Sequence, residues 1–385
     1  QGVPAWLLAV VGLAAVAIIA VGAFLLLRSR NGGETDEQTT DGVVEATATP
    51  SRVVIVAPTE PLLDGLATAT KTAEPTVLAT EPPPATATPA NWRVTILPGG
   101  VESAQVLVPA GAFLMGAEDE DADEDEDPVH EVRLNAFWLD VTEVTNNQYA
   151  AFVADTGYVT TDELDGIGYT IVGSDFQDVR GANWRHPLGP NSDIIGQDDH
   201  PVTMVSWDDS RAYCAWVGGR LPTEAQWEYA ARGPQATTYP WGHLSSDERV
   251  NSCDRNCPMD WANDDTDDGY VFAAAVGTFG GGQSGVGAED MAGNVWEWTA
   301  DWYDPDYYAR SPVDNPTGPS GSVDEDGKSV RGGAWSSTKQ GVRSTTRVSV
   351  GAWRGHFDVG FRCVYDDVPA SAALPSAAPA DALTL

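Results

Sequence analysis

Two adjacent hydroxyl side chains in the C-terminal part of the chain are the first groups that could carry chemistry. Ser336 and Ser337 follow a glycine pair and Trp335, and Arg343 lies a few residues further on. A serine hydroxyl becomes a nucleophile only beside a general base, and many hydrolases carry it on a G-x-S-x-G turn. No such turn occurs in the sequence. The spacing therefore assigns no hydrolase chemistry to this segment.

Thiol and imidazole groups are few. The four cysteines are Cys214, Cys253, Cys257 and Cys363, and the five histidines form no H-x-x-x-H pair. An even number of cysteines in a chain expected outside the cytoplasm predicts two disulfides, with Cys253 and Cys257 forming a short local bridge. A zinc site is the alternative, but the spacings contain no C-x-x-C pair.

Acidic residues dominate the composition. The chain has 57 Asp and Glu against 21 Lys and Arg, which gives a formal net charge of −36. Such a chain repels nucleic acid and anionic lipid, so its partners are expected to be cations or basic protein surfaces.

Residues 5–27 carry no charge and are followed by Arg28 and Arg30. A bilayer core of about 30 Å needs about 20 apolar residues, so residues 1–30 are predicted to be a transmembrane anchor that contacts lipid through 5–27. A cleaved signal peptide is the alternative, but the run is too long and no A-x-A-like site follows. The two arginines alone favour a cytoplasmic C-terminus. Because the cysteines favour an oxidising compartment, we place the globular part on the outer (periplasmic or extracellular) face of the cytoplasmic membrane.

Composition divides the rest of the chain into three parts. Residues 31–91 are rich in Thr, Pro and Ala and predict a stalk or docking linker, 92–367 a globular domain, and 368–385 a flexible tail. Residues 118–127 are acidic at every position except Ala122. This run is expected to be a solvated loop, and a weak cation site or a docking strip for a basic partner is the alternative.

The globular part predicts both strands and helices. Strands are expected over 106–116 and 132–141, and helices over 146–155, 207–218 and 223–232. Thr223 is the expected N-cap of the last helix, with Glu224 in its first turn. The 14 tryptophans and frequent Gly and Pro indicate irregular loops over an aromatic core.

Several separated motifs occur in a characteristic order. They include Ala112-Phe113-Leu114-Met115-Gly116, Asp140-Val141-Thr142-Glu143-Val144-Thr145-Asn146, Gly181-Ala182-Asn183-Trp184-Arg185-His186-Pro187, Arg220-Leu221-Pro222-Thr223-Glu224, Asp290-Met291-Ala292-Gly293-Asn294-Val295-Trp296-Glu297-Trp298 and Gly360-Phe361-Arg362-Cys363. In this order and spacing, the chain from about residue 105 to 365 resembles the sulfatase-modifying factor (formylglycine-generating enzyme) family. The resemblance implies an α+β domain of low regular secondary structure, related to C-type-lectin folds.

The resemblance also implies a site. In the family, two cysteines bind copper and activate oxygen to oxidise a sulfatase cysteine; their positions here are Ser337 and Val342. A hydroxyl is a poor soft-metal ligand and valine has no donor atom, so we predict no copper and no catalytic residue. The expected pseudo-active-site groove consists of Ala334, Trp335, Ser336, Ser337, Val342 and Arg343. The family's pairing further implies a Cys214–Cys363 disulfide.

Two structural calcium sites follow from the same resemblance. The first is expected at Asp290, Gly293, Val295 and Glu297, and the second at Asn251, Ser252, Asp268 and Tyr270. In each set, carboxylate or amide side chains combine with backbone carbonyls, the mixture of oxygen ligands that Ca²⁺ prefers. The alternative is that these side chains only cap turns.

The sequence thus predicts a membrane-anchored, non-catalytic formylglycine-generating-enzyme-like module. It would act as a scaffolding or accessory subunit beside other membrane-protein subunits, with an energy-transducing electron-transfer complex as one possible host. One alternative is an enzyme of the superfamily with substituted chemistry near Trp335, Ser336 and Arg343. A surface ligand-binding protein of lectin-like fold is the other.

Overall fold

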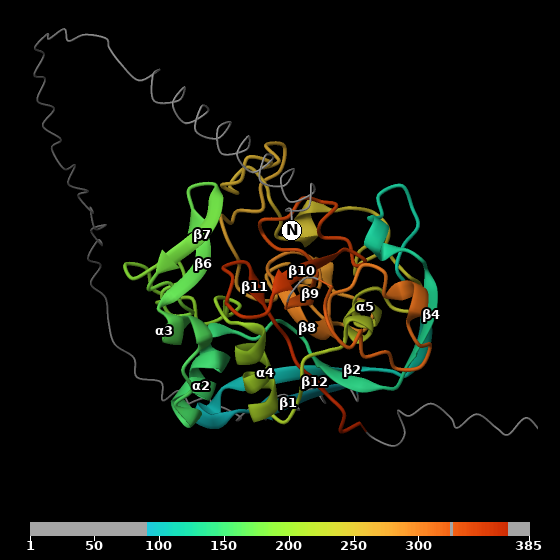
Figure 1. Cartoon of the computed structure of the whole chain (residues 1–385), viewed down its shortest axis with the longest axis horizontal. Coiled ribbons are helices and arrows are strands. Elements are labelled where there is room, and N and C mark those ends of the chain that lie inside the picture. The colour runs from blue at the N-terminus through green and yellow to red at the C-terminus, as the bar shows by residue number, and fades with distance from the viewer. Residues whose placement is uncertain (1–90, 324–325, 369–385) are drawn as a thin grey trace, which may run out of the picture. The chain divides into compact units, whose positions relative to one another are not determined.

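The computed structural model describes residues 91–323 and 326–368, which form a mixed fold of helices and strands (Figure 1). The predicted α+β class is therefore confirmed. The expected membrane span at 5–27, nearly all of the stalk and nearly all of the tail lie outside the described residues. No helix of the described part is long and apolar enough to cross a membrane.

The strands form two four-stranded sheets and two hairpins. The first sheet has the order β1 (Trp92–Ile96), β2 (Glu102–Val108), β5 (Phe137–Asp140) and β12 (Val364–Tyr365). The second has the order β10 (Arg347–Gly351), β9 (Gly327–Arg331), β8 (Trp296–Trp302) and β11 (Val359–Gly360). The hairpins pair β3 (Gly111–Met115) with β4 (His130–Leu134), and β6 (Ile167–Val172) with β7 (Asp175–Arg180). Only the β8–β11 pair is parallel among these ladders of the described residues.

Within the described residues, four α-helices and several short 3₁₀ turns accompany the sheets. The helices are α2 (Asn146–Thr156), α3 (Thr161–Asp165), α4 (Trp207–Trp216) and α5 (Glu224–Arg232). The 3₁₀ turns are η1 (Pro98–Gly100), η2 (Glu124–Glu126), η3 (Asp247–Arg249), η4 (Gly280–Gly282) and η5 (Tyr308–Arg310). Each α-helix begins with a capping box, so its first backbone donors are satisfied locally. Thr223 caps α5, as predicted.

The predicted strand boundaries are partly wrong. The expected strand 106–116 is two strands, because Pro109 has no N–H to donate and the chain breaks between β2 and β3. The expected strand 132–141 is likewise split into β4 and β5. The helix expected at 207–218 ends at Trp216, and Gly218 beyond it has a φ of 80°, which favours glycine.

The core is aromatic, as the composition predicts. Trp227, Trp298 and Trp335 are among the largest fully buried side chains. Buried ion pairs lie beside this apolar material: Arg331 contacts both Glu224 and Glu228 on α5. Figure 1 shows β8 to β11 at the centre of the described fold. The segment that follows β9 therefore starts from a rigid position.

Candidate functional site

The segment from Ala334 to Arg343 leaves β9 through a pair of glycines and folds back on itself. Gly333 has a φ of 75°, and a Cβ at this position would meet the Gly341 carbonyl oxygen at 2.6 Å. Glycine alone tolerates both the left-handed backbone and this approach. The two ends of the segment therefore lie against each other, which brings the predicted groove residues together.

The two serine hydroxyls of this segment are occupied by local hydrogen bonds. Ser337 Oγ accepts a hydrogen bond from the Ala334 amide at 3.0 Å. Ser336 Oγ donates to Asp358 Oδ2 at 2.8 Å, and burial raises the pKa of Asp358 to about 6. Neither hydroxyl hydrogen-bonds a histidine among the described residues, so the serine–histidine pair of a hydrolase is not formed by these two serines.

Val342, at the second predicted thiol position, lies in an apolar cluster. It is 1% exposed and packs with Tyr239, Val250 and Ala292. A hydrocarbon in this environment offers no metal ligand, and Ser337 offers only a hydroxyl. The residues present therefore do not fit a copper ion.

The predicted groove is covered. Among its six members only Ser337 is half-buried, whereas the other five are buried. Cys253 donates its amide to the Ser337 carbonyl at 2.9 Å, and Trp261 Nε1 donates to the Ser336 carbonyl at 2.8 Å. Phe272 packs edge-on against Trp335. Residues 253–272 therefore lie over the segment that would carry the chemistry.

The acidic run is exposed over most of its length, as expected of a solvated loop, but part of it is docked on the fold. Arg343 Nη2 pairs with Asp119 Oδ2 at 2.6 Å, and Gln340 Nε2 donates to the Asp121 carbonyl at 3.0 Å. Glu126 is fully buried and lies 3.7 Å from Arg343 Nη1. The docking of Asp119 and Glu126 was not predicted, because their partner Arg343 lies far along the chain.

Both predicted disulfides are present. Cys214 is bonded to Cys363, and Cys253 to Cys257; no described cysteine is free. The first joins α4 to the residue before β12. The second closes the short loop that donates to Ser337.

The first expected calcium set lies around a cluster of buried carboxylates. Both oxygens of Glu297 accept hydrogen bonds from Arg362 at 2.7 Å, whereas Asp290 Oδ2 accepts one from the Gly277 amide. Glu143, which the sequence analysis did not include, completes the cluster and has a buried Oε2 with no hydrogen-bond partner. Burial raises the pKa of Asp290 to about 6, and burial with the neighbouring Asp290 raises the pKa of Glu143. Bringing these carboxylates together in their ionised form is therefore costly, and a cation between them would lower that cost.

The second expected set is held by its own backbone. Asp268 accepts hydrogen bonds from the Ser252 amide at 3.1 Å and the Tyr270 amide at 2.9 Å. Burial and, to a lesser degree, Asp254 raise the pKa of Asp268 to about 6. The structure thus brings Ser252 against the turn that contains Asp268 and Tyr270.

Asn294 joins the two sets, and the sequence analysis missed its role. Its Oδ1 accepts from the Asn251 side chain at 3.2 Å, and its Nδ2 donates to Glu143 at 2.9 Å. Asn294 has a φ of 62°, and Gly293 before it would place a Cβ 2.1 Å from the Asn251 carbonyl oxygen. An Asn after a glycine in the Asp290–Trp298 motif was the available signal, since both residue types favour the left-handed region.

The donor set can be tested against calcium. Within the described residues, no group of three His, Cys, Asp or Glu side chains is placed to hold a metal by itself. The expected sets differ from such a group because they draw half of their oxygens from backbone carbonyls, which suits Ca²⁺. The unpartnered oxygen of Glu143 adds one available donor. The residues present therefore fit a calcium ion that is held by both side-chain and backbone oxygens.

Comparison with known proteins identifies relatives over the whole described fold. A family profile described as "Sulfatase-modifying factor enzyme 1-like domain" matches residues 98–367. The chain is 40% identical over 290 residues to a formylglycine-generating enzyme of Streptomyces coelicolor, covering 68% of this chain and 89% of that protein. It is 35% identical over 286 residues to the inactive C-alpha-formylglycine-generating enzyme 2 of Mus musculus, covering 68% and 85%.

Solved structures agree on the fold. PvdO from Pseudomonas aeruginosa matches with a TM-score of 0.54 and 27% identity, over 68% of this chain and 93% of that chain. Treponema denticola variable protein 1 matches with a TM-score of 0.52 and 20% identity, over 72% and 99%. The second likeness concerns the fold alone.

Proposed function

Because the chain belongs to the sulfatase-modifying factor enzyme 1-like family, we propose that it is a member that has lost the oxidase chemistry and serves as a binding module. The observation that carries the proposal is the state of the two thiol positions. The Ser337 hydroxyl accepts a hydrogen bond from the Ala334 amide, and Val342 lies in an apolar cluster. A copper-binding thiol pair has no counterpart there.

The covering of this segment supports the same proposal. A substrate peptide would have to displace Trp261 and the backbone of Cys253, both of which hydrogen-bond to it. The relative of Mus musculus that is named inactive gives a precedent for a family member of comparable similarity without activity.

The role proposed is that of an accessory subunit. The module is anchored by residues 5–27 and stands on the outer face of the cytoplasmic membrane, where it binds other membrane-protein subunits. The charge of −36 favours basic partner surfaces, and an energy-transducing electron-transfer complex is one possible host. Structural calcium at the two sets joined by Asn294 stabilises the loops of this module.

An enzyme with substituted chemistry is the second candidate. The observation that favours it is the hydrogen bond of Ser336 to Asp358, a carboxyl whose pKa burial raises to about 6. Such a group can act as a general base near neutral pH. Ser336 is buried and Asp358 is half-buried, which argues against access of a substrate.

The loss of oxidase chemistry is tested by incubating the full chain, with copper and oxygen, with a peptide containing the C-x-P-x-R sulfatase motif. Mass spectrometry is expected to find no conversion of cysteine to aldehyde, while a formylglycine-generating enzyme converts the peptide under the same conditions. Aldehyde formation by this chain overturns the proposal.

The accessory role is tested separately by purification from the native membrane in mild detergent. Specific co-purification of membrane subunits is expected, and loss of those subunits from a variant without residues 1–30 supports anchoring. A lone monomer contradicts the accessory role and leaves the first test unaffected.

A further inference from the structure

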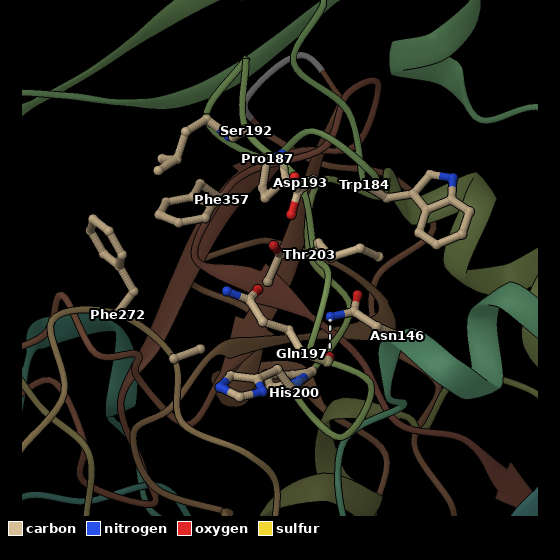
Figure 2. A pocket seen from close by; sticks show the side chains of 14 residues that line it. Asn146, Trp184, Pro187, Ser192, Asp193, Gln197, His200, Thr203, Phe272 and Phe357 are labelled. Atoms are coloured by element: carbon tan, nitrogen blue, oxygen red, sulfur yellow. Dashed lines mark hydrogen bonds between the residues drawn. The ribbon is translucent and has the colours of Figure 1, made fainter. Parts of the chain in front are cut away.

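A small cavity lies beside the covered segment and is separate from it. It has a volume of about 100 Å³ and is lined by the loop after β7, by Phe272 and Ala273, and by Phe357. Figure 2 shows the rings of Phe272 and Phe357 on one side and the side chains of Asn146, Gln197 and His200 on the other. A cavity of 150 Å³ accepts benzene, so this one admits roughly four to five heavy atoms.

The apolar wall is rigid. Phe272 and Phe357 contact each other edge-on, with ring centroids 5.0 Å apart, and both also pack against Trp335. Trp335 is 1% exposed, so these rings are fixed from behind by the core. A wall held in this way keeps its shape without a ligand, which reduces the entropy lost on binding.

The residues that line the cavity carry negative charge only. Among its lining residues only Asp193 and His200 are ionisable, and burial lowers the pKa of His200, so the imidazole is neutral at pH 7. Asp193 is exposed at the rim, and Asp198 and Asp199 in the same loop are also exposed. No lysine or arginine lines the cavity to neutralise Asp193. A cationic ligand is favoured here and an anionic one is repelled.

Aromatic rings beside a carboxylate are a combination that suits an ammonium group on a short hydrocarbon chain. The rings attract the cation through their quadrupole and pack against its methylene groups, while the carboxylate pairs with the charge. Thr203 and Gln197 add hydroxyl and amide oxygens to the lining, which can accept the ammonium hydrogens. All the requirements of one ligand class are therefore met within one cavity.

We propose that this cavity, formed by Phe272, Phe357, Asp193 and Gln197, is a binding site for a small aliphatic ammonium group. The site goes beyond the accessory role, and its test does not depend on that role. The ammonium group comes either from a free amine or from a lysine side chain of a partner protein, and the two sources share the same recognition.

The probe is n-butylammonium chloride, titrated into the full chain by calorimetry, with 1-butanol as the neutral ligand of matched chain length. Butylammonium is expected to bind more tightly than butanol, and less so at high salt, because the difference is electrostatic. Asp193→Asn is expected to weaken butylammonium about threefold to fivefold, the effect of one exposed ion pair, and to leave butanol unchanged.

Asp198→Asn is the matched control, because it removes the same charge from the same loop without altering the lining. Ala273→Leu, which fills the cavity, is expected to abolish binding of both ligands while circular dichroism stays unchanged. Equal binding of butylammonium and butanol, or equal losses in Asp193→Asn and Asp198→Asn, overturns the proposal. N-acetyl-lysine methylamide separates the sources: its binding assigns the site to a lysine side chain, and its failure beside bound butylammonium assigns it to a free amine.

Discussion

Arg343 Nη2 lies 2.6 Å from Asp119 Oδ2, a residue 224 positions earlier in the chain. This contact joins the acidic run to the segment that holds Ser337 and Val342. The two partners differ in exposure: the Arg343 side chain is 3% exposed and that of Asp119 is 56% exposed. Beneath them, Glu126 is fully buried and has no hydrogen bond to either carboxylate oxygen.

Removing the two partners of this pair is therefore expected to have unequal effects. Arg343→Met leaves the buried Glu126 without its ion-pair partner, so that only the more distant Arg331 still attracts it, and should lower the free energy of unfolding by about 3 kcal/mol. Asp119→Asn removes an exposed partner and should cost less than about 1 kcal/mol. Urea unfolding measures both, and Arg211→Met, at an exposed pair with Asp208, is the control. Equal losses for Arg343→Met and Asp119→Asn contradict this assignment.

Calcium is expected to reverse the effect of one substitution on the melting temperature. Glu143→Gln replaces a buried carboxyl whose Oε2 has no hydrogen-bond partner and whose pKa is raised by burial and by Asp290. Without calcium the variant avoids the cost of ionising this carboxyl, so at alkaline pH its melting temperature should be higher than that of the wild type; with calcium it lacks a ligand, so its melting temperature should be lower. In the wild type, calcium at 100 times its Kd should add about 2.7 kcal/mol. Thermal unfolding with chelator or with calcium checks this, with Asp260→Asn at an exposed carboxylate as the control. A change in melting temperature in the same direction with chelator and with calcium counts against the calcium site.

The two disulfides should differ in their contribution to stability. Their partners are separated by 149 residues in Cys214–Cys363 and by 4 in Cys253–Cys257. In the loop-entropy description the long loop contributes about 5 kcal/mol and the short one about 2 kcal/mol. The double variant Cys214→Ser/Cys363→Ser should therefore lose more stability in urea than Cys253→Ser/Cys257→Ser. A larger loss for the short loop would instead indicate that this bridge mainly holds residues 253–272 over Ser337.

Much of the fold could be predicted because its signals are local. Thr223 followed by Glu224 and Gln226 is a helix start whatever surrounds it, and α5 begins there. The cysteine count predicted two bridges, and both are present.

What could not be predicted depends on contacts distant in sequence. Glu126 is buried because Arg343 lies beside it, and no property of an acidic run indicates which of its members will meet a cation. The covering of Ser336 by Trp261 spans 75 residues. Asp193, Phe272 and Phe357 line the cavity for which we propose an ammonium ligand, and no pattern in the sequence connects these three residues.

A buried carboxyl on α3 predicts a pH dependence of stability. Asp162 is 1% exposed; its Oδ1 accepts from the Gly355 amide at 3.0 Å, whereas its Oδ2 has no partner. Burial, and to a lesser degree Asp209, raises the pKa of Asp162 from 3.8 to about 7. The folded state therefore binds this proton more tightly than the unfolded state does. The resulting stabilisation is fully present below about pH 4 and is lost as pH rises through about 7.

Asp162→Asn should remove this dependence, because an amide keeps the oxygen that accepts from Gly355 and cannot titrate. The difference in unfolding free energy between the wild type and the variant is expected to fall by roughly 2–4 kcal/mol between pH 4 and pH 8. Asp175→Asn, at an exposed position in the β6–β7 hairpin, should leave the wild-type profile unchanged. Urea unfolding across this pH range measures the difference directly. A constant difference between wild type and Asp162→Asn would mean that Asp162 is ionised in the folded protein throughout, and that Oδ2 has found a partner such as a bound water.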